Sequence, residues 1–257
     1  MVWVLTQMPE LVINKTVNTT ESVVNGTNVT YTIIVNNTGH APAYNVTLVD
    51  NFNSLNISNN ATVIDSLKIT YSDETSITLS PNQQKSFFNG TGLVITSLTN
   101  GTYLNITYHV VFNENLIPKS KYINTANITA FYSSPEAGAE NYVNTTDSAY
   151  HSTAEVKTTS LNFTKEYVKS NDTINSFKNL TIGETGIWYL NVTLPKNLNV
   201  TNLTIEDILP TGFLYTNLTI NTTSTNKSFI DFLNVNTVTN TTSNNVTTVT
   251  IKFSKDY

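Results

Sequence analysis

Apolar and polar residues alternate one by one through most of this chain, and this alternation constrains the fold more than any other feature. In the run Asn28–Asn37, NVTYTIIVNN, every second residue from Val29 to Val35 is apolar. Successive side chains of a strand point to opposite faces, so this period places one face in a core and the other in water. No stretch keeps the 3.6-residue apolar period of an amphipathic helix. The sequence therefore predicts a nearly all-β protein.

Composition narrows the class of protein further. Charged residues make up 12% of the 257 residues, the net charge is −5, and the 13 basic residues include no arginine. A nucleic-acid-binding protein needs a basic stripe, usually with arginine, so we expect no nucleic-acid partner. The chain has no cysteine, which removes disulfides and thiolate metal sites. No apolar run is long enough to span a bilayer, so we expect no membrane insertion in this chain.

The chain contains an internal repeat. The segment Val29–Phe52 aligns without gaps with Gly186–Leu209, and the preceding segment Leu11–Val17 matches Leu161–Val168. The matched residues include Tyr31 with Trp188, Val35 with Val192, Asn45 with Asn202, Asp50 with Asp207 and, upstream, Lys15 with Lys165.

We therefore expect tandem immunoglobulin-like β-sandwich domains, in an all-β fold. Residues 1–9 would form an N-terminal extension, 10–157 the first repeat, and 158–257 a second repeat that looks truncated, as in a piece of a longer protein. Turn-forming Asn, Gly, Ser and Pro separate the further strands expected in the first repeat. These strands are Ile64–Tyr71, Ser76–Leu79, Gly92–Thr96, Tyr103–Phe112, Tyr122–Phe131 and a last one around Asn144–Glu155.

Three runs carry a resemblance to a known family: VTYTIIVNNTGHAPAYNVTLVDNF, YINTANITAF and IEDILPTGFLY. Together they resemble the immunoglobulin-like conserved repeat of large bacterial and archaeal surface proteins, including adhesin-like proteins of methanogenic archaea. The first repeat departs from the family pattern after Asp50, where it has Asn51–Phe52 in place of Leu-Pro.

The resemblance implies an extracellular protein of the cell surface or cell wall, with no enzyme turnover. Its domains would space and present a binding surface for other cells, a host surface or cell-wall polymers, beside neighbouring repeats of the same protein. The alternative is a structural surface-layer or sheath component that associates with its own copies.

Three polar residues of the first repeat, Lys15, Asp50 and Asn124, fall on the core-facing parity of their strands. Their apolar neighbours two residues away are Ile13 and Val17, Leu48 and Phe52, and Ala126. A buried lysine or aspartate needs a partner or a chemical use. The second repeat has Lys165 and Asp207 at the equivalent positions but ends before an equivalent asparagine.

This set resembles the triad of surface-protein domains that form an intramolecular lysine–asparagine isopeptide bond. The resemblance implies a cross-link between Lys15 and Asn124, catalysed by Asp50 in a single event, and none at Lys165. Burial lowers the pKa of a lysine and raises that of an aspartate, which suits a neutral nucleophile and an acid catalyst. Two alternatives stay open: a buried ion pair with Asn124 as hydrogen-bond partner, or a Lys15 exposed at a sheet edge.

The tripeptide Asn-x-Thr/Ser occurs about two dozen times, well above chance for this composition. Strand alternation explains part of the excess, because residues i and i+2 share the exposed face. The same exposure would admit a glycosyltransferase, so we expect N-glycosylation in the native host. The candidate sites are Asn45, Asn105, Asn127, Asn191, Asn202 and Asn217.

We expect no metal centre and no other cofactor. His40, His109 and His151 are far apart in sequence, and no helical histidine pair or HExxH motif occurs. Calcium stays an alternative at the acidic pairs Asp73–Glu74 and Glu206–Asp207. A calcium site there would need further oxygen ligands close to each pair.

Overall fold

The computed structural model describes residues 7–52, 55, 57, 60–113, 116–136, 139–169, 183, 185–195, 198, 200–222, 224–225, 227–234 and 236–254. The chain divides into two compact units, residues 1–160 and 161–257. That these units are two copies of one repeat stays a prediction of the sequence.

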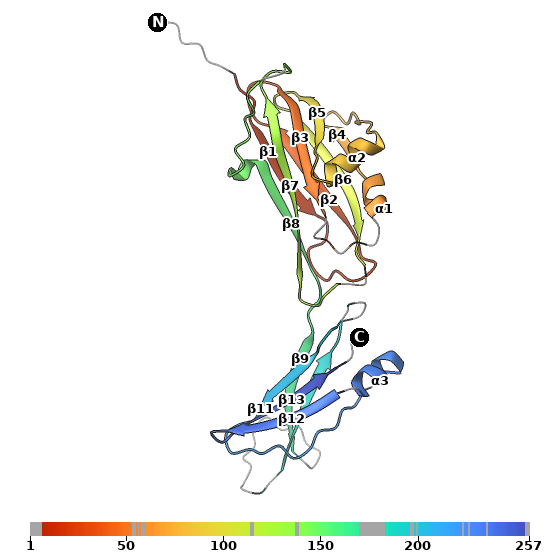
Figure 1. The fold of residues 1–257 in the computed structure, drawn as a ribbon, viewed down its shortest axis with the longest axis vertical. Coiled ribbons are helices and arrows are strands. Elements are labelled where there is room, and N and C mark those ends of the chain that lie inside the picture. Colours follow the sequence, from red (N-terminus) through yellow and green to blue (C-terminus); the bar gives the residue numbers. More distant parts are fainter. Residues whose placement is uncertain are drawn as a thin grey trace. The chain divides into compact units, whose positions relative to one another are not determined.

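The first unit consists of two four-stranded antiparallel sheets (Figure 1). One sheet has the order β1-β2-β6-β4, with β1 at Leu11–Val17, β2 at Asn28–Asn37, β6 at Tyr103–Val111 and β4 at Lys68–Tyr71. The other has the order β5-β3-β7-β8, with β5 at Leu93–Leu98, β3 at Ala43–Asn51, β7 at Lys121–Tyr132 and β8 at His151–Lys157. These antiparallel sheets confirm the predicted all-β class.

The alternation in the sequence is the burial pattern of the strands. In β2, Val29, Tyr31, Ile33 and Val35 are buried, while the three residues between them are only half-buried. The same alternation in β3, β6 and β7 turns a second set of apolar side chains into the space between the sheets. Burying each large apolar side chain stabilises the fold by roughly 1.5–3 kcal/mol relative to leaving it in water. The pattern that predicts strands therefore also supplies the core.

Short helices interrupt the strand pattern: α1 at Asn60–Asp65, α2 at Pro81–Phe88 and the 3₁₀ turn η1 at Ser148–Tyr150. The strand expected over Ile64–Tyr71 is present only from Lys68, and the last strand begins at His151. The strand expected at Ser76–Leu79 is wrong, since Ser76 makes only an isolated bridge. Helix α2 begins directly after this segment, with Ser80 as its N-cap, so the strand has no room to continue. Within the described residues, no helix is long and apolar enough to cross a membrane.

The second unit has two smaller antiparallel sheets. Strands β9 at Asn162–Lys169 and β10 at Gly186–Thr193 form one, and β11 at Thr204–Ile208, β13 at Val246–Phe253 and β12 at Asn236–Ser243 form the other, in the order β11-β13-β12. Helix α3, at Lys227–Asn234, places Phe232 against Ile251 and Phe253 of β13. These three residues form a buried hydrophobic cluster of the second unit.

The strand register agrees between the two units. Lys15 of β1 pairs with Ile33 of β2, and Lys165 of β9 pairs with Leu190 of β10. The gapless alignment of the sequence matches Ile33 with Leu190. Each lysine therefore occupies the same position in the first pair of strands of its unit.

A second shared feature lies at the entry to β3 and β11. Asn45 and Asn202, which the alignment also matches, both have a left-handed backbone, with φ of 49° and 52°. Asparagine tolerates this conformation better than most residues. In β3 it accompanies a shift of register between Tyr44 and Thr47, which is a β-bulge. Asn45, Val46 and Thr47 nevertheless keep the expected alternation, because Val46 is buried between two half-buried neighbours.

Candidate functional site

Strand β1 turns Lys15 into the core of the first unit. Its neighbours Leu11 and Ile13 on the same face are buried, and the Lys15 side chain has no exposed surface. The backbone N–H of Lys15 donates to Ser152 Oγ of β8 at 2.8 Å, which joins this edge strand to the other sheet. Lys15 is thus held at both its backbone and its ammonium end.

Four buried polar side chains, Lys15 among them, form one hydrogen-bonded group. Lys15 Nζ donates to Asp50 Oδ2 at 2.5 Å and to Tyr108 Oη at 3.0 Å. Tyr108 Oη donates to Asp50 Oδ2 at 2.7 Å and accepts from Asn124 Nδ2 at 2.5 Å. We call Lys15, Asp50, Tyr108 and Asn124 the buried cluster. It brings together the three residues singled out in the sequence, from strands β1, β3 and β7.

Aromatic rings enclose the buried cluster. Lys15 Nζ lies 5.0 Å from the centroid of the Tyr31 ring and 5.5 Å from that of Tyr108, and these two rings stack at 5.4 Å. Phe88 of α2 meets the Tyr108 ring edge-on at 5.1 Å. The π faces attract the ammonium, and the rings keep water away from it.

Burial shifts the pKa of both ionisable partners toward the neutral form. Desolvation lowers the pKa of Lys15 to about 8, although the charge of Asp50 and its hydrogen bond oppose the shift. Desolvation likewise raises the pKa of Asp50 against the opposing effects of Lys15 and Tyr108. Both shifts move the pair toward a neutral amine beside a protonated carboxyl.

Two oxygens of the buried cluster have no hydrogen-bond partner. They are Asp50 Oδ1 and Asn124 Oδ1, both inaccessible to solvent. An unpaired buried acceptor costs roughly 1–3 kcal/mol. A proton on Asp50 Oδ1 would turn this oxygen from an acceptor into a hydrogen-bond donor.

Tyr108 is the member of the buried cluster that the sequence analysis missed. The signal is present in β6, where Leu104, Ile106, Tyr108 and Val110 share the core face. Tyrosine is an ordinary core residue with a polar tip, so its parity alone does not mark it. Only the approach of β6 to β7 across the sandwich shows that its hydroxyl joins Asp50 to Asn124.

The second unit holds the equivalent pair in a more open setting. Lys165 Nζ contacts Asp207 Oδ1, but 31% of the Lys165 side chain and 12% of the Asp207 side chain remain exposed. The ammonium lies 5.7 Å from the centroid of the Trp188 ring, the residue aligned with Tyr31. The pair is therefore present in both units but fully enclosed only in the first.

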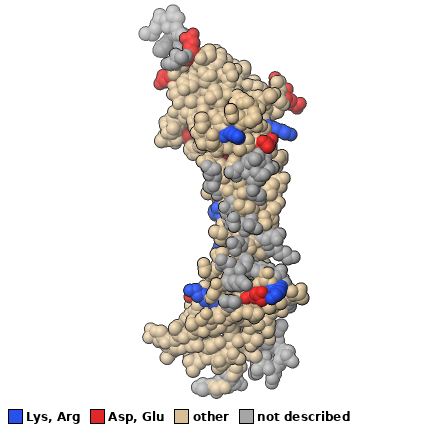
Figure 2. Space-filling model, turned by 45° about the vertical axis from the view of Figure 1, so that its right-hand side comes forward, with Lys and Arg blue, Asp and Glu red and all other residues tan. Residues whose placement is uncertain are grey.

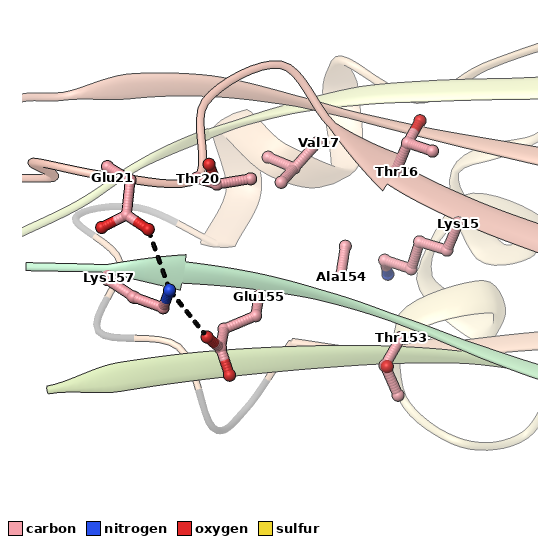
Figure 3. A pocket seen from close by; sticks show the side chains of 9 residues that line it. All are labelled: Lys15, Thr16, Val17, Thr20, Glu21, Thr153, Ala154, Glu155 and Lys157. Carbon is pink, nitrogen blue, oxygen red and sulfur yellow. Dashed lines mark hydrogen bonds and ion pairs between the residues drawn. The ribbon is translucent and has the colours of Figure 1, made fainter.

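A groove runs along the first unit where β1 and β8 approach each other (Figure 3). At one end Lys157 Nζ bridges Glu21 at 2.8 Å and Glu155 at 3.6 Å, and Lys15 lies at the other end. Because Lys157 is exposed, these ion pairs contribute little to stability. Lys15 lines this groove, but its side chain has no surface exposed to solvent.

The candidate glycosylation sites differ in exposure. Asn191, Asn202 and Asn217 are exposed, whereas Asn45, Asn105 and Asn127 are only half-buried. Few charges mark the surface: on the face shown in Figure 2, most described atoms belong to neither acidic nor basic residues.

Acidic side chains do not converge on a cation site in the part of the chain that the structure describes. No three His, Asp or Glu side chains gather there in a group that could hold a metal ion. Asp73 Oδ1 instead accepts from the backbone N–H of Thr75 and closes a turn, while Asp207 contacts Lys165.

No protein-family model and no curated protein matches the chain. Among solved structures, it is similar to the CARDB domain of a Pyrococcus furiosus protein, with 10% identity over 61% of this chain and 99% of that one and a TM-score of 0.32. It is also similar to the collagen adhesin of S. aureus, with 15% identity, coverage of 56% and 48%, and a TM-score of 0.30. The T6 backbone pilin of Streptococcus pyogenes matches with 13% identity, coverage of 95% and 46%, and a TM-score of 0.33. The chain spans about half the length of the adhesin and the pilin.

Proposed function

We propose that this chain is part of an extracellular cell-surface protein, in which immunoglobulin-like units space and present a binding surface. Other cells, a host surface or cell-wall polymers would be its partners. A surface rich in Asn and Thr, with charged residues at 12% and no cysteine, supports this setting. Glycans on exposed sequons such as Asn191, Asn202 and Asn217 would add to the solubility of so weakly charged a surface.

The observation that carries the proposal is the buried cluster. A domain without cysteine cannot be stabilised by disulfides, and Lys15, Asp50 and Asn124 offer a different covalent link. We propose that Lys15 and Asn124 form one intramolecular amide, with Asp50 as the catalytic residue and Tyr108 as a positioning residue. The link would join β1 of one sheet to β7 of the other.

The residues of the buried cluster supply every atom and proton that the proposed reaction needs. The neutral Lys15 Nζ attacks Asn124 Cγ while the protonated Asp50 donates a hydrogen bond to the carbonyl oxygen. Asp50 then relays a proton from the amine to the departing Nδ2. The Cγ–Nδ2 bond breaks, ammonia leaves, and an Nζ–Cγ amide remains. Asp50 recovers its proton, and because lysine and asparagine are both consumed the event occurs once per chain.

Such a link would act mainly through the unfolded state. Closing a long loop lowers the conformational entropy of the unfolded chain, as a disulfide does, and a loop of about 100 residues is worth roughly 4–5 kcal/mol in that model. An amide has the further property that reducing agents do not cleave it. Both properties suit a protein exposed outside the cell.

Intact mass spectrometry of the purified 257-residue chain tests the proposal. We expect a mass lower than that of the sequence by one ammonia, and a proteolytic fragment that joins the segments around Lys15 and Asn124. The full unmodified mass in correctly folded protein would contradict it and would leave a noncovalent buried cluster.

Three variants and one matched control assign the roles. Lys15→Arg, Asn124→Ala and Asp50→Asn should each keep the full mass, the last because an amide side chain cannot relay the proton. The control Lys165→Arg changes the equivalent lysine of the second unit and should still lose one ammonia. Circular dichroism of each variant shows whether it has folded before its mass is interpreted.

A further inference from the structure

The chain has three Asn-Gly pairs, and each is followed by threonine. They are Asn25–Gly26, Asn89–Gly90 and Asn100–Gly101. All three asparagines are exposed, and all three glycines have a left-handed backbone, with φ of 81°, 86° and 71°. Because glycine has no side chain to shield its nitrogen, that nitrogen can attack the side-chain carbonyl of the asparagine before it. Each pair is therefore chemically able to lose ammonia.

The glycine N–H is held in two of these pairs and free in the third. Gly26 N donates to Phe112 O at 2.9 Å, and Gly101 N donates to Asn37 O at 2.9 Å. Gly90 N has no hydrogen-bond acceptor among the described residues. Cyclisation requires the nitrogen to lose its proton and to turn toward the asparagine side chain. In the first two pairs this movement breaks a backbone hydrogen bond, whereas Gly90 has none to break.

The side-chain carbonyl of Asn89 is also polarised. Thr91 N donates to Asn89 Oδ1 at 2.9 Å, a side-chain turn that folds the amide over the Gly90 peptide. In the other two pairs the equivalent threonine, Thr27 or Thr102, donates its N–H to a backbone carbonyl instead. A donor at Oδ1 stabilises the negative charge that this oxygen gains when Cγ is attacked. Two independent observations therefore single out the same pair.

We infer that Asn89 is a site of spontaneous covalent modification, in which Gly90 N attacks Asn89 Cγ and closes a cyclic imide. A hydroxide ion takes the proton of Gly90 N, the Cγ–Nδ2 bond breaks, and Nδ2 leaves as ammonia after taking a proton from water. Water then adds to either carbonyl of the ring and gives aspartate or isoaspartate at position 89. The net change converts one amide and one water into one acid and one ammonia. The inference does not depend on a covalent bond between Lys15 and Asn124.

Both products affect helix α2, because Asn89 is its C-cap. A carboxylate there lies at the negative end of the helix dipole, which disfavours the helix. Isoaspartate also adds one carbon atom to the main chain before Gly92, whose N–H donates to Ser86 O at 2.8 Å and fastens the chain to the helix end. Phe88, the last residue of α2, packs on Tyr108. Modification of Asn89 therefore loosens the aromatic cover of the buried cluster.

Peptide mapping of the folded chain over time tests the inference. The 257-residue protein is produced without N-glycosylation, so that each amide is free, and is incubated at mildly alkaline pH. Trypsin releases Ser86–Lys119 as one peptide that contains both Asn89 and Asn100, so fragment ions compare the two sites in one spectrum. We expect Asn89 to convert at least about tenfold faster than Asn25 or Asn100, since no backbone hydrogen bond has to be broken first. In urea-unfolded protein the three rates should become similar.

Matched variants separate this modification from the proposed cross-link. The cyclic imide and the cross-link each lower the mass by one ammonia, so the position of the loss is read from the peptides. Lys15→Arg cannot form the cross-link but should still convert Asn89 faster than Asn100. Asn89→Gln should leave position 89 intact, because attack on the longer side chain closes a larger ring. Asn89→Asp reproduces one product and should speed hydrogen exchange of α2, whereas Asn100→Asp, in the turn between β5 and β6, should not.

Two results would overturn the inference. One is equal conversion of the three asparagines in the folded protein, or conversion that is fastest at Asn25 or Asn100. The other is an Asn89 that stays intact in the folded protein while the unfolded chain converts. A linked fragment of Lys15 and Asn124 beside an intact Asn89 would refute this inference alone and would leave the cross-link standing.

Discussion

The same lysine–aspartate pair has different surroundings in the two units. In the first, Lys15 and Asp50 have fully buried side chains, and burial moves the pKa of each toward the neutral form. In the second, Lys165 keeps nearly a third of its side-chain surface in contact with solvent. The identity of the two residues therefore does not fix their surroundings, because in the first unit Tyr108 and the rings around it enclose the pair.

The protonation of Lys15 gives a pH test for the unlinked state. In an Asn124→Ala variant, the folded protein holds Lys15 with a pKa of about 8, against an ordinary value of 10.5 in the unfolded chain. Between these values the unfolded state binds more protons, so the free energy of unfolding should rise with pH. Urea titrations at several pH values between 8 and 10 measure this slope.

The cross-linked wild-type protein should lack that rise, because an amide nitrogen does not titrate. Removing Lys15 as well, in Lys15→Met/Asn124→Ala, should abolish the slope and serves as the control. Burial raises the pKa of Tyr31 and of Tyr108 above the ordinary value of 10.0. Above that pH the folded state holds more protons than the unfolded state, so these tyrosines make the free energy of unfolding fall with pH. The slope due to Lys15 is therefore measured below pH 10. An equal slope in wild type and Asn124→Ala would argue against the cross-link.

The positions of Lys15, Asp50 and Asn124 could be predicted from the sequence because strand parity fixes the face of each side chain. Tyr108 could not, since parity places it in the core like any aromatic residue. The solvent exposure of Lys165 was also beyond prediction. Its parity equals that of Lys15, and exposure depends on which strands cover that face.

At the scale of elements, strands could be predicted better than helices. Strand alternation is a long-range signal repeated many times, whereas α2 is only eight residues long. Its start is nevertheless encoded locally: Ser80 Oγ accepts from Gln83 N, Gln83 Oε1 accepts from Ser80 N, and Pro81 follows the cap. This capping box is a recognisable helix start that the alternation hides. The helix matters because Phe88 at its end packs on Tyr108.

Removing the cap of α2 should weaken the first unit. In Ser80→Ala, the N–H of Gln83 loses its acceptor, and we expect the free energy of unfolding to fall by about 1 kcal/mol. Urea unfolding followed by circular dichroism measures the change. Ser86→Ala, inside the same helix, is the matched control and should change stability by less, because its hydroxyl bonds only to a carbonyl that the helix already engages. Equal losses in both variants would mean that the cap does not hold the helix.

At the scale of the whole molecule, the two units differ in how much core they enclose. Four inward residues of β2 are at most 1% exposed, whereas the equivalent side of β10 is only half-buried. Packed cores give slow local opening, and uncovered faces give fast opening. Stability is therefore not shared evenly along the chain.

Hydrogen exchange should reveal this difference directly. We expect amides of β2 and β6 to exchange far more slowly than those of β9 and β10, as measured by mass spectrometry on the intact chain. Equal protection of β2 and β10 would contradict the uneven core.

The position of Lys15 on the first strand of its unit has a consequence for a protein under tension. A pull on the N-terminal side enters the unit through β1. With Lys15 joined to Asn124, the force would leave β1 through the new amide, pass into β7 and continue along β8. The segment between residues 15 and 124, which includes helices α1 and α2 and the five strands β2 to β6, would lie outside the loaded path and stay folded while the ends are stretched.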